Sequence, residues 1–367
     1  MFKKCFILII IFLSAACSIS ETIQIKQPEN KISGETITLS GFAENSLLKS
    51  NISNLKVYSF NKEKNKVYYK ENIDYVTAGN RIKRIKDSKI PNFALHKVVL
   101  NDDLRFTFSA SPRNPELTIE YQVFCDYGYT DAESLEGHYK NSFLSPEIKE
   151  KLKDKKVIKI AVIGTSISAG AHTFAQYYEG SDRETYPHLV ATAIKNKFGS
   201  QVIINNYSKG GSSLSYLEDS YETIIAENYD LIFIEFGMND HLYSFWFEQL
   251  PNFESVMSSF LKTSRENNVN IVLVGFFQQN TLWDLEFACS TNAYNQVLFN
   301  IAGNFNCFFA DINKEFAKYS QKKINQDLCG DYMHHPTTFG HQLYYKTIMP
   351  IFLEDTVSDK SLYKLIN

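Results

Sequence analysis

Cysteine is scarce in this sequence, and the few cysteines are widely spaced. The chain has 367 residues and six cysteines, none of them in a CxxC-type pair. A structural zinc site needs closely spaced ligands, so such a site is disfavoured. Six cysteines are also too few for a disulfide scaffold in a chain of this length. In an exported protein a single bridge between Cys289 and Cys329 remains open.

The sequence also lacks an excess of positive charge. Lys and Arg total 38 against 41 Asp and Glu, which gives a net charge of −3. Binding to a phosphate backbone needs clustered positive charge, so nucleic acid is excluded as the expected partner. Hydrophobic residues make up 44% and charged residues 22%, and no repeat or low-complexity tract is visible. This composition predicts globular folding, and an aromatic share of 14% supplies large side chains for the core.

No apolar run is long enough to span a membrane, and the longest lies at the amino terminus. Lys3 and Lys4 precede an apolar run over Cys5–Leu13, and small residues follow at 14–16. As a helix this run rises only about 14 Å, which is far short of the hydrocarbon core of a bilayer. Residues 1–20 are therefore predicted to be a signal peptide, and the mature protein is expected to be exported to the periplasm, the cell envelope or the medium.

Cys17 leaves two forms of the mature amino terminus open. Small residues followed by a cysteine resemble a bacterial lipoprotein cleavage site, which would tether the protein to a membrane through a lipidated Cys17. However, the large aliphatic residue usually found three positions earlier is Ser14 here. Ordinary cleavage nearby is the alternative, since a signal peptide indicates export but not tethering.

The first part of the mature chain has a strand-like pattern. Polar and apolar residues alternate in short segments rich in β-branched and aromatic side chains, separated by turn residues. These segments are Thr36–Leu39, Leu55–Phe60, Leu104–Phe108 and Leu117–Val123. Several such strands without long helices predict an antiparallel β-sandwich domain over residues 21–145.

The second part, residues 146–367, has a different pattern of polar and apolar residues. It begins with a charged stretch at 145–156, which is typical of a linker or a short surface helix. Apolar strands then alternate with amphipathic helices. The expected strands are 157–163, 201–205, 230–236, 270–276 and 308–312, and the expected helices are 188–198, 253–267, 293–305 and 338–352. This alternation predicts a three-layer α/β/α fold around a mostly parallel sheet. Function is then expected at the carboxyl ends of the strands.

Three of these strand ends carry loops suited to acyl-transfer chemistry. The first is GTSISAG, where Ser166 is placed as a nucleophile. The second contains a glycine pair whose backbone N–H at Gly211 can face a reacting carbonyl oxygen. The third is GMND, where Asn239 can direct its side-chain amide to the same oxygen. Each loop alone is equally typical of ordinary turns.

A fourth segment near the carboxyl end is rich in histidine. Asp331 is followed by His334, His335 and His341. A carboxylate can orient one ring nitrogen of a histidine while the other accepts the proton of a nucleophile. Pro336 is expected in the first turn of the closing helix, which would place His335 at its start. A metal site is the rival for a histidine cluster, but the sequence has no HExxH motif and no cysteine pair nearby.

Together the four segments resemble, in order and spacing, the SGNH (GDSL-type) hydrolase superfamily over residues 158–352. The resemblance implies a flavodoxin-like α/β/α fold and a Ser-His-Asp triad with no cofactor and no metal. It also implies an oxyanion hole that includes the backbone N–H of the nucleophile. The residues that would fill these roles are Ser166, Gly211, Asn239, Asp331 and His335.

The sequence departs from the family pattern in two places. The first motif has Thr165 where the family usually has aspartate, which predicts altered local hydrogen bonding. The last motif has one histidine more than usual between Asp331 and Pro336. His335 is preferred as the base because it directly precedes the proline, and His334 is the alternative.

The resulting hypothesis is an exported serine esterase. An α/β hydrolase domain after a β-sandwich resembles carbohydrate O-acetylesterases of the superfamily, some of which carry a jelly-roll domain. We therefore expect the protein to remove acetyl groups from a carbohydrate or a cell-wall glycan. Alternatives are a short-chain lipase or esterase, an O-acetyltransferase with the same triad, and a catalytically inert glycan-binding envelope protein.

Overall fold

The fold is described from a computed structural model. It describes residues 30–61, 63, 65–95, 121–130, 143–173, 185–243, 249–280 and 291–353. Five features expected from the sequence lie wholly or mostly outside this part of the chain: the signal peptide, Cys17, the strand at 104–108, the strand at 117–123 and Cys289. The predicted boundaries at residues 20 and 145 remain predictions.

Two antiparallel sheets form the amino-terminal part, as the alternating pattern predicts. The larger sheet has the order β1-β7-β3-β4, and the smaller has the order β2-β6-β5. Their strands are β1 (Asn30–Ile37), β2 (Asn45–Ser46), β3 (Ile52–Phe60), β4 (Lys66–Tyr69), β5 (Tyr75–Ala78), β6 (Arg81–Arg84) and β7 (Val123–Tyr129). A short 3₁₀ helix, η1 (Phe93–Leu95), follows β6 in the chain.

A five-stranded parallel sheet organises the rest of the chain, and the predicted α/β class is confirmed. The strand order is β12-β11-β10-β8-β9, and every neighbouring pair is parallel. The strands are β8 (Ile158–Gly164), β9 (Val202–Asn206), β10 (Leu231–Glu235), β11 (Asn270–Val274) and β12 (Phe308–Ala310). The order reverses between β8 and β10, and in open α/β sheets ligands bind outside the carboxyl ends of the strands at such a point.

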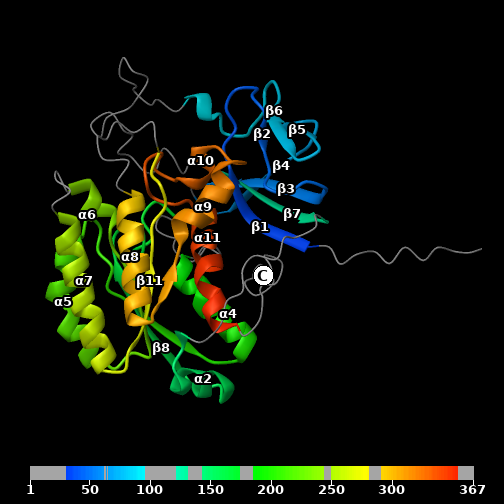
Figure 1. Cartoon of the computed structure of the whole chain (residues 1–367). Helices are drawn as coiled ribbons and strands as arrows, with labels where there is room; N and C mark the ends of the chain where they lie inside the picture. Colours follow the sequence, from blue (N-terminus) through cyan, green and yellow to red (C-terminus); the bar gives the residue numbers. More distant parts are fainter. Residues whose placement is uncertain are drawn as a thin grey trace, which may run out of the picture.

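Helices cover both faces of the parallel sheet (Figure 1). One layer contains α5 (Leu214–Ala226), α7 (Gln249–Glu266) and α8 (Thr291–Phe305), which pack side by side. The other contains α4 (Tyr186–Phe198), α9 (Ile312–Ser320) and α11 (Thr338–Ile348). The short helices α6 (Met238–Tyr243) and α10 (Asn325–Leu328) and the 3₁₀ helix η4 (Met349–Phe352) complete the described elements.

The charged stretch after residue 145 forms α2 (Pro146–Lys153), a helix that buries Ile148 and Leu152, so the short helix is the one of the two expected forms that is confirmed. Other elements differ from the sequence-based expectation. The closing helix ends at Ile348 and continues as 3₁₀ helix η4, because Pro350 cannot continue an α-helical ladder. The prediction for Pro336 was wrong. Thr337 is the N-cap of α11, so Pro336 lies before the helix rather than in its first turn.

The amino-terminal sheets pack directly against the carboxyl-terminal end of the α/β part. Strand β1 contacts both α10 and α11, and in Figure 1 the blue strand β1 lies beside these orange and red helices. The contact therefore joins the start of the described chain to its last helices. Within the described residues, no helix combines the length and apolar character needed to cross a bilayer.

Candidate active site

The structure brings a hydroxyl, an imidazole and a carboxylate into one hydrogen-bonded chain. Ser166 follows β8, and its Oγ lies 2.7 Å from Nε2 of His335. The other ring nitrogen, Nδ1, lies 2.5 Å from Oδ2 of Asp331. His335 and Asp331 belong to the loop between α10 and α11. These contacts join positions that are 169 residues apart in the sequence.

Asp331 is fully buried, and its own loop surrounds it with donors. Its Oδ1 accepts hydrogen bonds from the backbone N–H groups of Met333, His334 and His335, at 2.8, 2.9 and 3.0 Å. The Cys329 thiol also donates to Oδ1, at 3.1 Å, and Cys329 is a free cysteine. Burial alone would raise the pKa of Asp331, but the imidazoles of His335 and His334 hold it well below the ordinary value. The carboxylate is therefore ionised beside His335.

The turn that carries Ser166 is built over a second buried carboxylate, Glu235 at the end of β10. Oε2 of Glu235 accepts hydrogen bonds from Thr165 N at 3.0 Å, from Thr165 Oγ1 at 2.8 Å and from Ser168 Oγ at 3.0 Å. The contact between Thr165 and Glu235 gives a physical reason for the departure from the family motif. The Thr165 hydroxyl donates to Glu235, whereas an aspartate there would place a second buried carboxylate against the first.

This turn also requires the glycine that ends β8. A Cβ built on Gly164 would lie 2.7 Å from the carbonyl oxygen of Glu235 and 2.8 Å from Oγ of Ser168, so no other residue fits without a shift. Burial raises the pKa of Glu235 to about 7, although hydrogen bonds from Thr165 and Ser168 favour the ionised form. The Glu235 carboxyl group beneath the Ser166 turn therefore has its pKa near neutral pH.

The glycine-pair loop lies next to Ser166. A Cβ built on Gly210 would be 3.9 Å from Ser166 Cβ, and one built on Gly211 would meet no atom within 4 Å. Gly211 is exposed and has φ +74°, a conformation that favours glycine. Within the described part of the chain, the backbone N–H groups of Ser166 and Gly211 donate no hydrogen bond. Both N–H groups are therefore available to a ligand oxygen.

Asn239 lies in helix α6 rather than in a strand-end turn, and it is tied to the glycine loop. Its Nδ2 donates to the carbonyl oxygen of Ser212 at 2.7 Å. The neighbouring Asp240 accepts from Leu214 N at 2.8 Å and from Gly237 N at 3.0 Å, which joins the second and third motifs. The amide of Asn239 carries two hydrogens, so one remains for a substrate oxygen.

Two further histidine rings pack on His335. The ring of His334 lies 4.1 Å from it and that of His172 lies 4.4 Å away, between centroids. Burial and the nearby His335 lower the pKa of His334 to about 3 and that of His172 to about 4, so both rings are neutral at ordinary pH. His334 Nδ1 lies 3.6 Å from Asp331 Oδ2, beyond the 2.5 Å of His335. This geometry favours His335 over His334 as the base.

Ligating atoms of His172, Asp331 and His335 lie within 4.8 Å of one another, so they form a candidate metal set among the described residues. However, Asp331 and His335 already use their facing atoms in a hydrogen bond to each other. A metal there would have to break the contact that orients His335. The arrangement is better suited to proton transfer than to metal binding.

Sequence reasoning named the residues that meet here but missed two of their neighbours. Glu235 was visible as a charged residue inside an otherwise apolar strand, which signals a buried carboxylate with a specific partner. His172 follows Ser166 in the same loop, and no motif marks it. Only the fold shows that its ring stacks on His335.

Comparison with known proteins agrees with this geometry. The model of the GDSL-like Lipase/Acylhydrolase family matches residues 162–343, which include all five predicted site residues. The chain belongs to this GDSL-like lipase/acylhydrolase family. It is therefore a carboxylic ester hydrolase by family, as predicted. None of the curated proteins compared with the chain matches it.

Solved structures with a related fold include two hydrolases. The acetylxylan esterase Axe2 from Geobacillus stearothermophilus is 20% identical, with a TM-score of 0.46, and the match covers 55% of this chain and 97% of Axe2. LAE5, an alpha/beta hydrolase enzyme from the metagenome of Lake Arreo in Spain, is 17% identical, with a TM-score of 0.45. That match covers 57% of this chain and 96% of LAE5.

The raised pKa of Glu235 predicts a pH-dependent stability. Between about pH 5 and 7 the unfolded chain loses a proton that the folded chain retains at Glu235. This group therefore makes the free energy of unfolding fall as pH rises, by at most about 1.4 kcal/mol per pH unit. In Glu235→Gln the effect is absent. Urea titrations at pH 5 to 8 give the free energy of unfolding of the wild type and of the variant. The wild-type value minus the variant value should fall as pH rises and level off above pH 7.

The exposed Glu222 on α5 offers a matched control. Glu222→Gln should leave the slope of stability against pH close to that of the wild type, because water reaches this side chain in both states. A difference between wild type and Glu235→Gln that stays constant from pH 5 to 8 would contradict the assignment.

Proposed function

We propose that this protein is an exported serine esterase that removes O-acetyl groups from a carbohydrate or cell-wall glycan. The observation that carries the esterase mechanism is the continuous contact from Ser166 Oγ through His335 to Asp331. Nucleophile, base and orienting carboxylate stand in the order that acyl transfer requires. The predicted signal peptide supports export, and a lipidated Cys17 would tether the enzyme to a membrane.

The proposed mechanism follows from the contacts. Nε2 of His335 takes the hydroxyl proton of Ser166 while the Ser166 oxygen attacks the carbon of the ester carbonyl. Asp331 stabilises the imidazolium that forms. The N–H groups of Ser166 and Gly211 and the amide of Asn239 receive the oxyanion. His335 then passes the proton to the departing alcohol. Water, activated by the same nitrogen, splits the acyl-enzyme and releases the acid.

The surface next to Ser166 supports a small acyl group on a polar alcohol. Lys209, Gly210 and Gly211 are exposed, and Lys209 N holds the loop against β8 through the carbonyl oxygen of Gly164 at 3.0 Å. Among the described residues, this side of the site presents exposed backbone and the positive side chain of Lys209, which lies over the ring of Tyr216. Exposed backbone and an ammonium group can form hydrogen bonds with a sugar, and an aromatic ring can pack against its apolar face.

Removing the nucleophile should abolish ester hydrolysis. Ser166→Ala is expected to lower kcat for p-nitrophenyl acetate by at least about 10⁴-fold, because the triad acts as a unit. It should also abolish labelling by a fluorophosphonate probe. Ser215→Ala, an exposed serine on α5, is the matched control and should retain both activities. Equal hydrolysis by wild type and Ser166→Ala would exclude this mechanism.

The two adjacent histidines should differ sharply in their effect. His335→Ala is expected to lose at least about 10³-fold in kcat, because it removes the base. His334→Gln is expected to lose no more than about tenfold, because its ring packs beside the base and lies farther from Asp331 than His335 does. Steady-state kinetics on purified variants measures both values. The reverse order would identify His334 as the base.

Acyl-chain preference tests the proposed substrate class. The enzyme should release acetate from acetylated xylan or acetylated peptidoglycan, and kcat/KM for p-nitrophenyl esters should fall from acetate to octanoate. A maximum at octanoate would instead indicate a lipase. Acetate that appears on an added sugar acceptor, rather than in solution, would indicate the acetyltransferase. Fluorophosphonate labelling without turnover of any of these esters would leave the active serine but overturn the proposed substrates.

A further inference from the structure

The loop that carries Asp331 and His335 is closed at its base by hydrogen bonds. It leaves α10 after Leu328 and returns at Thr337, whose N–H donates to the carbonyl oxygen of Leu328 at 2.8 Å. Within the loop, Gly330 N donates to the carbonyl oxygen of His335 at 2.7 Å. The position of the two ends of the loop therefore determines where Asp331 and His335 lie relative to Ser166.

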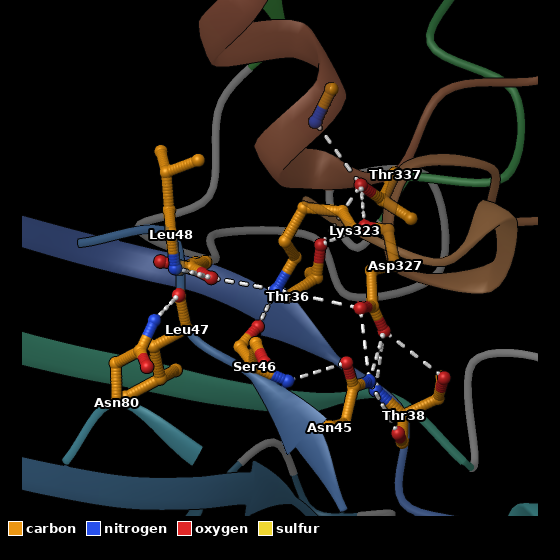
Figure 2. Close-up of polar contacts among 12 residues, drawn as sticks. Thr36, Thr38, Asn45, Ser46, Leu47, Leu48, Asn80, Lys323, Asp327 and Thr337 are labelled. Atoms are coloured by element: carbon orange, nitrogen blue, oxygen red, sulfur yellow. Dashed lines mark hydrogen bonds and ion pairs between the residues drawn. The ribbon is translucent and has the colours of Figure 1, made fainter. Parts of the chain in front are cut away.

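Both ends of this loop are held by one side chain from the amino-terminal sheet. Thr36 on β1 donates its hydroxyl hydrogen to the carbonyl oxygen of Asp327 at 2.5 Å, and the same hydroxyl lies 3.0 Å from Oγ1 of Thr337. Thr337 in turn lies 3.0 Å from the Asp327 carbonyl and caps α11 by accepting from Gly340 N at 3.1 Å. Figure 2 shows the hydroxyls of Thr36 and Thr337 beside Asp327, whose backbone carbonyl they share.

The carboxylate of Asp327 is held by the same sheets. Its Oδ1 accepts from Thr38 N at 2.7 Å and from Thr38 Oγ1 at 3.0 Å. Its Oδ2 accepts from Asn45 Nδ2 at 3.0 Å. Asp327 is fully buried, so each of these donors replaces water that the carboxylate has lost.

A buried lysine completes this cluster from the hydrolase side. Lys323, between α9 and α10, lies 2.6 Å from Glu35 Oε1 on β1 and 3.4 Å from Asp327 Oδ2. Burial alone would lower the pKa of Lys323, but these two carboxylates raise it above the ordinary value. Its ammonium also donates to the carbonyl oxygen of Ser46 at 3.1 Å. Glu35, Lys323 and Asp327 thus form a charged network across the interface that allows little slippage.

We propose that the amino-terminal β-sheets position the catalytic Asp-His loop, and that Thr36 is the positioning residue at the centre of this contact. The inference rests on the proposed function, since it concerns how that active site is held. The proposal gives the amino-terminal sheets a role in positioning the active site, in addition to any role in binding a glycan. A displacement of about 1 Å at a catalytic group can lower turnover by about two orders of magnitude. A strand about 300 residues away in sequence thereby acts on His335.

Replacement of Thr36 by the isosteric valine removes the hydroxyl and keeps the β-branched shape suited to a strand. We expect Thr36→Val to lower kcat for p-nitrophenyl acetate by about tenfold or more, with KM changed less than twofold. Thr36→Ser restores the hydroxyl and should recover kcat to within about threefold of the wild type. This rescue would show that the loss of kcat in Thr36→Val comes from the lost hydrogen bonds and not from changed packing.

Gln342 provides the matched control. It lies on α11, and its Nε2 donates to the carbonyl oxygen of Ser33 on β1 at 2.9 Å, so it joins the same two parts without touching the ends of the loop. Gln342→Met should lower the thermal midpoint about as much as Thr36→Val and leave kcat near the wild-type value. Equal kcat in Thr36→Val and Gln342→Met would overturn the inference.

A spectroscopic readout separates this inference from the proposed activity. The proton between His335 Nδ1 and Asp331 gives a low-field proton resonance when the short contact is kept. We expect this signal in the wild type and in Gln342→Met, and its loss or upfield shift in Thr36→Val. If the wild type has no esterase activity, the proposed function is overturned. The resonance still tests the positioning role in that case, because it reports the contact between His335 and Asp331 without any turnover.

If Thr36→Val does not fold, Thr38→Val is measured against the same criteria. An unchanged resonance and an unchanged kcat in that variant would count against the inference.

Discussion

The arrangement of the active site depends on one buried carboxylate. Asp331 accepts three backbone N–H groups of its own loop through one oxygen and the imidazole of His335 through the other. A buried anion costs a great deal of free energy unless its lone pairs are satisfied, so the loop can adopt few other conformations. The same contacts orient His335 toward Ser166. The chemistry of the site and the conformation of this loop are therefore set by the same hydrogen bonds.

A second carboxylate plays the corresponding part beneath the nucleophile. Glu235 accepts hydrogen bonds from the turn that presents Ser166, and Thr165 supplies two of the donors, its backbone N–H and its hydroxyl. The family motif usually has an aspartate at this position. Here the acidic group comes from the neighbouring strand, so the turn keeps an acceptor without placing two carboxylates together. The change at Thr165 is thus coupled to the strand beside it and leaves the nucleophile in place.

The amino-terminal sheets and the hydrolase part form a connected structure. The contact between them is polar and charged where Glu35, Lys323 and Asp327 meet, and it lies at the base of the catalytic loop. Polar networks of this kind contribute less to net stability than to the choice of a single geometry, because a slipped interface would leave buried charges unpaired. In the proposed positioning role, the amino-terminal sheets act on catalysis through this contact and contribute no residue to the reaction.

The amino-acid sequence by itself determined the class of the fold and named the residues proposed to react. Strand and helix periodicity follow from local side-chain patterns, and motifs such as GMND and the Asp331–His335 segment keep their residue types at set spacings. Only the tertiary structure decided that His335 rather than His334 reaches Ser166, that His172 stacks on it, and that Thr36 holds the loop. These contacts join residues far apart in the chain, and their partners are chosen by packing and burial, which no local pattern records.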